Sequence, residues 1–167
     1  MTKVALLEAF KAYTEEIVKD VILPVNPQKN DKDEDPKSRT PEVHIGRLPD
    51  TGSSTKKAPY ILHQVVNSRT HQDPGELPES TCVVRSVFCV FNKNPEAGML
   101  SLIELMERLR INVLSDLWLA GQFELDREAG LEDLVYPNDT APYFMGEMLT
   151  VWKLPMVKRE VTQFWMK

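Results

Sequence analysis

Hydrophobic positions recur with the period of an α-helix in two segments of the chain. In residues 2–22, apolar side chains return every three or four positions, and Thr2 is suited to cap the first turn. Residues 94–118 carry a wider apolar stripe, with Asn94 as N-cap and Pro95 at the first helical position. We therefore predict two helices. Their apolar faces comprise Leu7, Phe10, Ile17, Val18, Val21 and Ile22 in the first, and Met99, Leu102, Ile103, Met106, Leu109, Val113, Leu114 and Leu117 in the second.

β-branched, aromatic and alternating segments predict five strands, over residues 42–48, 59–66, 81–91, 122–126 and 142–154. The third is apolar on both faces except at Arg85 and Ser86, which is typical of a strand in the middle of a sheet. The first lies between two prolines, as suits an edge strand. In the last strand, strict alternation places Tyr143, Met145, Glu147, Leu149, Val151 and Lys153 on one face.

Polar segments rich in proline, glycine and charge separate these elements. Residues 24–41 include a DKDED run, and we predict a long mobile loop there. Further loops are expected at 49–58, 67–80 and 127–140. The order α-β-β-β-α-β-β indicates an α+β fold with a single, mostly antiparallel sheet of four to five strands and two helices packed on one face. We expect one domain over residues 1–155, followed by a C-terminal tail at 156–167.

Composition narrows the class of protein. The chain has 167 residues, is 42% hydrophobic and has a net charge of −5, which suits one globular domain. An acidic chain without a Lys/Arg stripe is a poor partner for nucleic acid or for an anionic membrane. The N-terminus carries acidic residues where a signal peptide would stay apolar. We therefore expect no sequence-specific nucleic acid, no membrane partner and a cytoplasmic origin.

The sequence contains few residues that could bind a metal or catalyse a reaction. The histidines His44, His63 and His71 have no neighbours at metal-ligand spacing, so neither a metal nor another cofactor is expected. Cys82 and Cys89 fall on opposite faces of one strand and cannot bond to each other. These features predict a protein that is not an enzyme. A rival hypothesis, a small hydrolase or ligand-binding domain, requires a deep pocket that contains His63 or Arg85.

Arg85 interrupts an otherwise apolar central strand and must find a partner. Two interpretations stay open. In one, the arginine is paired within the chain or extends its charged end into water at the open face of the sheet. In the other, it forms a salt bridge to a neighbouring subunit.

Several segments carry a family resemblance. NPEAGMLSLIELMERLRINVLSD (94–116) is similar to the helix of bacteriophage tail-terminator (tail-completion) proteins, and PYFMGEMLTVWKLP (142–155) resembles the aromatic-rich closing strand of that family. FELD (123–126) lies between them, as in the family, and PYILHQVV (59–66) resembles its middle strand. The resemblance covers about residues 59–155, whereas the segment 24–58 has no counterpart in it.

The resemblance implies a structural protein of the virion tail or neck, assembled in the host cytoplasm. Family members form a ring, usually a hexamer, that caps the tail tube, stops its polymerisation and offers a surface to the head. The implied partners are further copies of the chain, the tail tube protein, a head–tail connector or stopper protein, and the sheath protein if the tail is contractile. A different neck component, such as a head-completion or stopper protein, is the nearest alternative.

Long loops on a small scaffold commonly carry function, so we expect the contacts to lie mainly there. The candidate residues for contacts between subunits or with the tube are Arg47, Lys56, Lys57, Arg69, Asp73, Glu76, Arg85 and Arg127.

Overall fold

The computed structural model describes residues 2–27, 38–50, 57–137 and 141–156. Two helices, α1 (Lys3–Val18) and α2 (Pro95–Asp116), accompany the strands. These are β1 (Leu23–Pro24), β2 (Ser38–Arg39), β3 (Glu42–Ile45), β4 (Tyr60–His71), β5 (Glu79–Phe91), β6 (Trp118–Leu119), β7 (Phe123–Leu125), β8 (Leu131–Val135) and β9 (Tyr143–Leu154). The remainder of the predicted loop at 24–41 and of the predicted tail, residues 28–37 and 157–167, lies outside the described residues.

One large mixed sheet dominates the described part of the chain. Its seven strands run in the order β3-β4-β5-β9-β7-β6, with β8 also paired to β9, and they curve into a half-barrel. β3 is parallel to β4, and the other pairs are antiparallel. A small separate sheet joins β1 to β2. The fold is α+β, but the predicted single sheet of four to five mostly antiparallel strands is wrong.

This error arises at strands that depend on pairing with other segments of the chain. The connection from β3 to β4 spans residues 46–59, which is long enough for the crossover that a parallel pair needs. β8 lies within the predicted loop 127–140, and its sequence LEDLV has too little alternation to predict a strand. Both of these strands are therefore stabilised by pairing with longer neighbours rather than by their own pattern.

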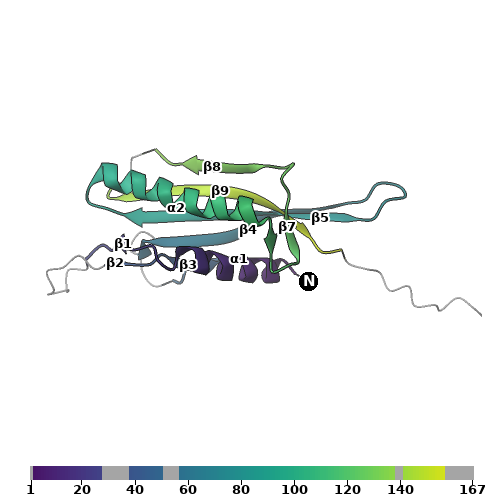
Figure 1. Cartoon of the computed structure of the whole chain (residues 1–167), viewed down its shortest axis with the longest axis horizontal. Coiled ribbons are helices and arrows are strands. Elements are labelled where there is room, and N and C mark those ends of the chain that lie inside the picture. Colours follow the sequence, from purple (N-terminus) through teal and green to yellow (C-terminus); the bar gives the residue numbers. More distant parts are fainter. Residues whose placement is uncertain (1, 28–37, 51–56, 138–140, 157–167) are drawn as a thin grey trace, which may run out of the picture.

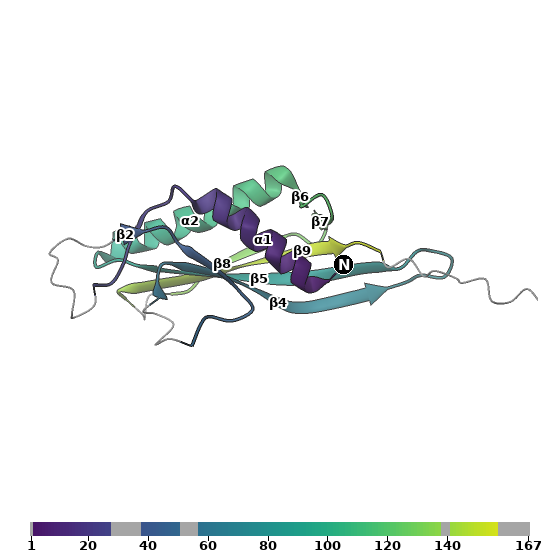
Figure 2. The same ribbon diagram turned by 90° about the horizontal axis from the view of Figure 1, so that it is seen from below.

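Both helices lie on the same face of the curved sheet, as the two views in Figures 1 and 2 show. α1 packs over β3 and β4, α2 packs over β5 and β9, and the helices also touch each other. The main core fills the space between this helix layer and the sheet. Every fourth residue of α1 from Leu6 to Val18 is buried there, including the polar Thr14.

α2 approaches β9 closely because each of these two elements has a glycine where it meets the other. A Cβ placed on Gly98 would lie 2.2 Å from Cε2 of Phe144 on β9. A Cβ on Gly146 of β9 would lie 2.7 Å from the sulfur of Met106 on α2. The absence of these two side chains lets the helix settle on the sheet at this spacing.

β4 and β5 continue well past the helix layer as a projecting hairpin, which extends to the right in Figure 1. The predicted loop at 67–80 is therefore mostly strand, because β4 runs to His71 and β5 starts at Glu79. A bulge between Val65 and Asn67 marks the start of the projecting part. We call residues 66–80 the hairpin arm.

Candidate assembly surfaces

The sheet face opposite the helices is only partly covered. In β9, Phe144, Met148, Thr150 and Trp152 face the helices and are buried, whereas the residues between them are half-buried or exposed. Register places the corresponding β5 residues on the same side. We call this surface the open face. In β5 and β9 it comprises Val83, Arg85, Val87, Met145, Glu147, Leu149 and Val151, and no described helix lies over it.

Arg85 lies in the middle of the open face and has partners within the chain. Its Nη2 donates to Oε1 of Gln64 at 2.7 Å, and its Nη1 lies 3.9 Å from Oε2 of Glu147. The same Glu147 oxygen accepts a hydrogen bond from the Tyr136 hydroxyl at 2.6 Å, and this bond raises the pKa of Tyr136. Arg85 is thus paired within the chain, as the first of the two interpretations expects.

This pairing is incomplete. The Arg85 side chain is 42% exposed, and within the described residues its Nε atom is buried without a hydrogen-bond partner. A buried donor without a partner costs free energy unless water or another molecule supplies an acceptor. The second interpretation, a contact to a neighbouring subunit, is also compatible with this geometry.

One end of the open face closes into a small second core. Tyr60, Leu62, Cys89 and Phe91 are buried there together with Ala58 from the segment before β4. Burial raises the pKa of the Cys89 thiol to about 12, and it also raises that of Cys82. The two thiols are free and lie on opposite faces of β5, as predicted. Neither has the lowered pKa of a reactive thiolate.

The hairpin arm holds three of the predicted contact residues. Arg69 lies on β4 rather than in a loop, opposite Thr81. Asp73 accepts a hydrogen bond from Nε2 of His71 at 2.8 Å, and the backbone N–H of Glu76 donates to the Asp73 carbonyl at 3.0 Å. These bonds order the turn of the hairpin, so the arm presents its polar groups in a fixed arrangement.

The remaining predicted contact residues are scattered. Arg47 follows β3 and forms an exposed ion pair with Asp50 at 2.8 Å. The Lys57 carbonyl accepts a hydrogen bond from Arg39. Arg127 is exposed in the turn before β8. Lys56 lies outside the described residues. The structure therefore brings Arg69, Asp73 and Glu76 together on one arm but does not gather the others with them.

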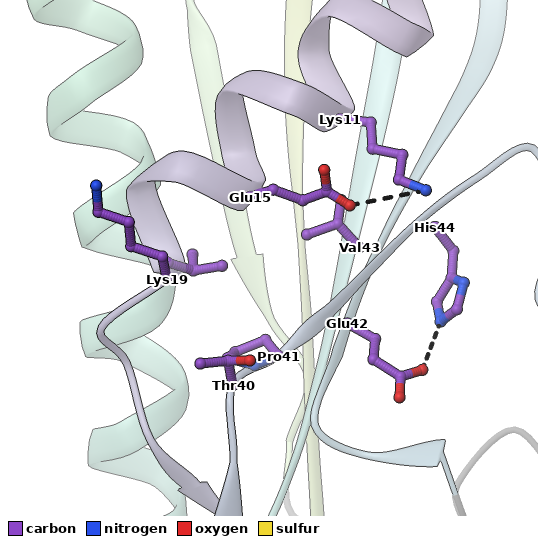
Figure 3. Close-up of a pocket in the computed structure, with 9 residues that line it drawn as sticks. Lys11, Glu15, Lys19, Thr40, Pro41, Glu42, Val43 and His44 are labelled. Carbon is purple, nitrogen blue, oxygen red and sulfur yellow. Dashed lines mark ion pairs between the residues drawn. The ribbon is translucent and has the colours of Figure 1, made fainter.

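A shallow pocket of about 420 Å³ lies between α1 and β3, and Figure 3 shows the side chains that line it. Four of its polar residues lie in two charged pairs, but within the described residues Nε2 of His44 is buried without a hydrogen-bond partner. Lys11 pairs with Glu15 at 3.7 Å, and His44 lies 3.3 Å from Glu42. Neither His63 nor Arg85, on which the ligand-binding or hydrolase hypothesis depends, lines this pocket.

His63 is instead fully buried in the main core. Its ring stacks on Phe10 with centroids 4.2 Å apart. Thr14 Oγ1 lies 2.9 Å from Nε2, and Ser86 Oγ lies 2.7 Å from Nδ1. Both ring nitrogens are satisfied, and burial lowers the pKa of His63 to about 3. The histidine is therefore a neutral, structural residue that tethers α1 to β4 and β5.

A second apolar surface, which the sequence did not single out, lies on the outside of α2. Leu100, Ile103, Ile111 and Leu114 are 60%, 45%, 55% and 41% exposed, and Trp118, just past the helix, is 51% exposed. We call these five residues the α2 stripe. The sequence does show apolar residues on two sides of this helix, and that pattern is the signal for a second apolar surface. Ile103 and Leu114 were predicted to lie on the core-facing side of this helix, but both are exposed to solvent.

The described residues contain neither a metal-binding cluster nor a helix that could span a membrane. No group of three or more His, Cys, Asp or Glu side chains is placed to hold a metal ion. Neither described helix is long and apolar enough to cross a membrane. No protein-family model matches the chain, and no curated protein matches it.

Proposed function

We propose that this chain is a structural virion protein that assembles as a ring, caps the tail tube of a bacteriophage and stops its polymerisation. The ring would form the tail side of the head–tail joint. The family resemblance supports this proposal, because its four segments coincide with β4, α2, β7 and β9. These elements are three strands of the large sheet and the helix that packs over β5 and β9.

The open face is the observation that carries the proposal. Five half-buried apolar residues of β5 and β9 flank a central arginine there, and no described helix covers them. Exposed Leu134 of β8 extends the apolar surface beside Glu147. A continuous apolar area on a small protein favours contact with another protein. Further copies of the chain are the partners that a ring supplies.

Strand edges offer additional contacts. β3 pairs only with Tyr60–His63, so among the described strands none pairs with the outer edge of β4 from Gln64 to His71. Such an edge exposes backbone groups that can pair with a strand of another molecule. Its polar and charged side chains, which include Arg69, would limit nonspecific pairing.

The hairpin arm is our candidate for the contact with the tube protein. It projects beyond the helix layer, and its turn is held by the hydrogen bonds of Asp73 (Figure 1). An ordered projecting arm can reach a neighbouring ring with little entropic cost. Arg69, Asp73 and Glu76 would then match polar groups of the last tube ring and block addition of the next. Arg47 and Arg127 remain candidates for the connector or stopper protein, or for the sheath in a contractile tail.

The proposal places the protein in the neck of the virion and, during assembly, in the host cytoplasm. It requires no catalysis and no cofactor. The other neck functions differ in the partner they bind. A head-completion or stopper protein would bind the connector of the head, whereas a tail terminator binds the end of a tube.

Two measurements test the proposal. Native mass spectrometry of the purified chain should show a closed oligomer, with a hexamer as the expected species. Negative-stain images of tubes assembled from the tube protein of the same phage should show the chain at tube ends and shorter tubes in its presence. A chain that stays monomeric at about 100 µM and leaves tube length unchanged would refute the proposal. Binding to connector rings but not to tubes would favour a head-side neck protein.

A further inference from the structure

We propose that β8 of one copy pairs with the unpaired edge of β4 in the next copy, as antiparallel strands of one continuous sheet. This inference rests on the proposed function, because it specifies how strand edges join neighbouring copies of the ring. Four features of the described residues carry it: the two edges, the direction of their strands, the orientation of their backbone groups and their side chains.

Each side of the large sheet has an unpaired edge among the described strands. On one side, β3 pairs with β4 only as far as His63, which leaves residues 64–71 without a partner strand. On the other side, β8 pairs with β9 alone, so its outer edge is unpaired along Leu131–Val135. Figure 1 shows β8 at the upper margin of the fold, and Figure 2 shows the end of β4 at the lower margin. One copy can therefore use both edges at once.

The strand directions already suit such a contact. β4 is antiparallel to β5, β5 is antiparallel to β9, and β9 is antiparallel to β8. Three reversals make β8 run opposite to β4 within one copy. A second copy placed alongside in the same orientation therefore presents β4 antiparallel to β8 of the first. Because no copy has to be turned over, the contact can repeat until rotation closes it into a ring.

The backbone groups of β8 that reach the unpaired edge can be identified by alternation. In an antiparallel strand, the N–H and C=O groups of successive residues point alternately to the two sides. The N–H of Tyr136 donates to the Met145 carbonyl of β9 at 3.0 Å. Even-numbered residues of β8 therefore face β9, and Leu131, Asp133 and Val135 direct their N–H and C=O groups outward.

In β4 the bulge determines which backbone groups point outward. Before the bulge, His63 points outward, because its carbonyl accepts a hydrogen bond from the N–H of Gly46 at 2.8 Å. The bulge adds one residue after Val65 and so reverses the alternation along the rest of the strand. Beyond it, Ser68 and Thr70 direct their N–H and C=O groups to the unpaired edge.

One alignment of the two edges joins these outward groups. It pairs Ser68 with Asp133 and Thr70 with Leu131, all of which lie on the helix-covered side of the sheet. A shift by one residue would set outward groups against groups already bonded within the chain. It would also place residues from opposite faces of the sheet side by side.

The same alignment sets Arg69 opposite Glu132 on the side of the open face. Both side chains are exposed, and within the described residues neither forms an ion pair. By register, the strand acid closest to Arg69 is Glu79, opposite His71, and the cation closest to Glu132 is Arg85, two strands away. Directly opposite charges on neighbouring strands stabilise a pair. The contact thus gives Arg69 and Glu132 a partner that their own chain does not supply.

Two exposed apolar side chains also meet in this alignment. Val66, the extra residue of the bulge, is 56% exposed, and Leu134 of β8 is 54% exposed. Leu134 lies opposite Asn67, the next residue after Val66. Contact between the copies would remove both apolar side chains from water, which stabilises the association.

The contact divides the hairpin arm between two partners. The outer edge of the arm, which includes Arg69, faces the neighbouring copy. Asp73 and Glu76 lie in the turn, beyond the part of β4 that β8 would cover. The contact of the arm with the tube protein therefore narrows to these two residues.

A disulfide experiment tests the alignment. Asn67→Cys and Leu134→Cys in one chain would lie at a pair without mutual backbone hydrogen bonds, where Cα atoms are about 4.5 Å apart and a disulfide can form. After mild oxidation of the ring, non-reducing electrophoresis should show a ladder of covalent oligomers that neither single variant gives. Thr70→Cys with Leu134→Cys is the matched control and should give no ladder, because these side chains lie on opposite faces of the sheet. The native Cys82 and Cys89 are buried.

Charge reversal tests the ion pair independently. Arg69→Glu or Glu132→Arg alone sets like charges opposite each other and should weaken association of the copies about fivefold or more. Both reversals in one chain restore opposite charges and should return association to within about twofold of the wild type. Glu128→Arg, at an exposed position in the turn before β8, is the matched control and should leave association unchanged. Native mass spectrometry measures association, and circular dichroism checks the fold of each variant.

The outcomes separate this contact from the proposed function. A wild-type ring that gives no ladder with the cysteine pair and tolerates both single reversals would overturn the strand contact and leave the ring proposal intact. A ladder that continues into open chains without a closed species would support the contact and contradict the ring. A wild-type chain that stays monomeric would overturn both.

Discussion

On one face of the seven-stranded sheet the side chains of β9 are buried beneath α2, and on the other face their immediate neighbours in the same strand are half-exposed. Trp152 is 1% exposed, whereas Val151 beside it is only partly buried. Both faces carry apolar residues, so hydrophobicity alone does not distinguish them. The two faces differ in whether a helix of the same chain packs on them. The open face is apolar in composition, as a protein core is, but no described helix packs on it.

The two faces also differ in how completely their buried polar groups are hydrogen-bonded. Beneath the helices, His63 is satisfied at both ring nitrogens, and Trp152 donates to Thr150 at 2.9 Å. On the open face, within the described residues, Arg85 keeps one buried N–H without an acceptor. Fully satisfied polar groups define a completed interior, whereas a partly satisfied group marks a surface that a partner can complete. Substitutions on the two faces should therefore affect different equilibria.

The largest contrast is expected at two adjacent residues of β9. Trp152→Ala should lower the free energy of unfolding by about 3–5 kcal/mol, because it leaves a cavity beside Phe10 in the main core. Val151→Ala should lower it by less than about 1 kcal/mol and should weaken ring formation instead. Urea unfolding of the dissociated chain and native mass measure the two effects. Equal losses of stability at the two positions would show that the open face is covered within the chain.

A smaller effect is expected where α2 touches the sheet. Gly98→Ala should cost about 1–3 kcal/mol, because the new Cβ would lie 2.2 Å from the ring of Phe144, which is buried in the main core. Phe144→Leu in the same chain should recover part of the loss by making space. Ser101→Ala, on the same helix, is the control and should change stability by about 0.5 kcal/mol or less. Chemical denaturation checks all four chains, and a neutral Gly98→Ala would mean that α2 can lift from β9 freely.

His63, which is buried on the helix-covered face of the sheet, predicts that the free energy of unfolding depends on pH. Its pKa is about 3 in the folded chain and near 6.5 in the unfolded chain, so the unfolded state binds the proton first. The contribution of His63 to the free energy of unfolding should have its full value above pH 6.5. Below that pH it should fall by about 1.4 kcal/mol per pH unit and level off near pH 3. Unfolding measured at pH 7.5, 6.5 and 5.5 gives the slope. His63→Asn should be less stable at neutral pH yet lack this component of the slope, and an unchanged slope would show that other groups cause it.

The sequence predicted best those elements that depend on local signals. Asn94 caps α2 with a 3.2 Å bond to the backbone N–H of Ala97, and strict alternation separates the two faces of β9. β5 lies between β4 and β9, as its two-sided apolar pattern indicated. α2 ends at Asp116, two residues before the predicted end at residue 118, because Leu117 adopts the left-handed conformation and stops the helix.

Elements that depend on distant pairing were missed. The hairpin arm is polar on both faces, so its strands look like a loop, although Thr70 and Ser80 face each other across it with hydroxyls 2.9 Å apart. β8 is an edge strand whose Asp133 is held by Arg110 of α2, a contact across 23 positions of sequence. The α2 stripe was missed for a related reason. An apolar surface wider than one face does not reveal which part meets the core.

The smallest effect is expected for the ion pair at the centre of the open face. Arg85 and Glu147 are 3.9 Å apart, and the arginine is 42% exposed, so water screens much of their attraction in the single chain. A double-mutant cycle with Arg85→Gln and Glu147→Gln should give a coupling below about 1 kcal/mol when unfolding starts from the dissociated chain. If a neighbouring copy covers the open face, the same pair becomes buried and its coupling should increase when the cycle is measured on the dissociation of the ring. Unequal couplings in the two cycles would show that the cover comes from another copy. Equal couplings would mean that the pair remains in solvent after assembly, and that the ring closes through strand edges instead.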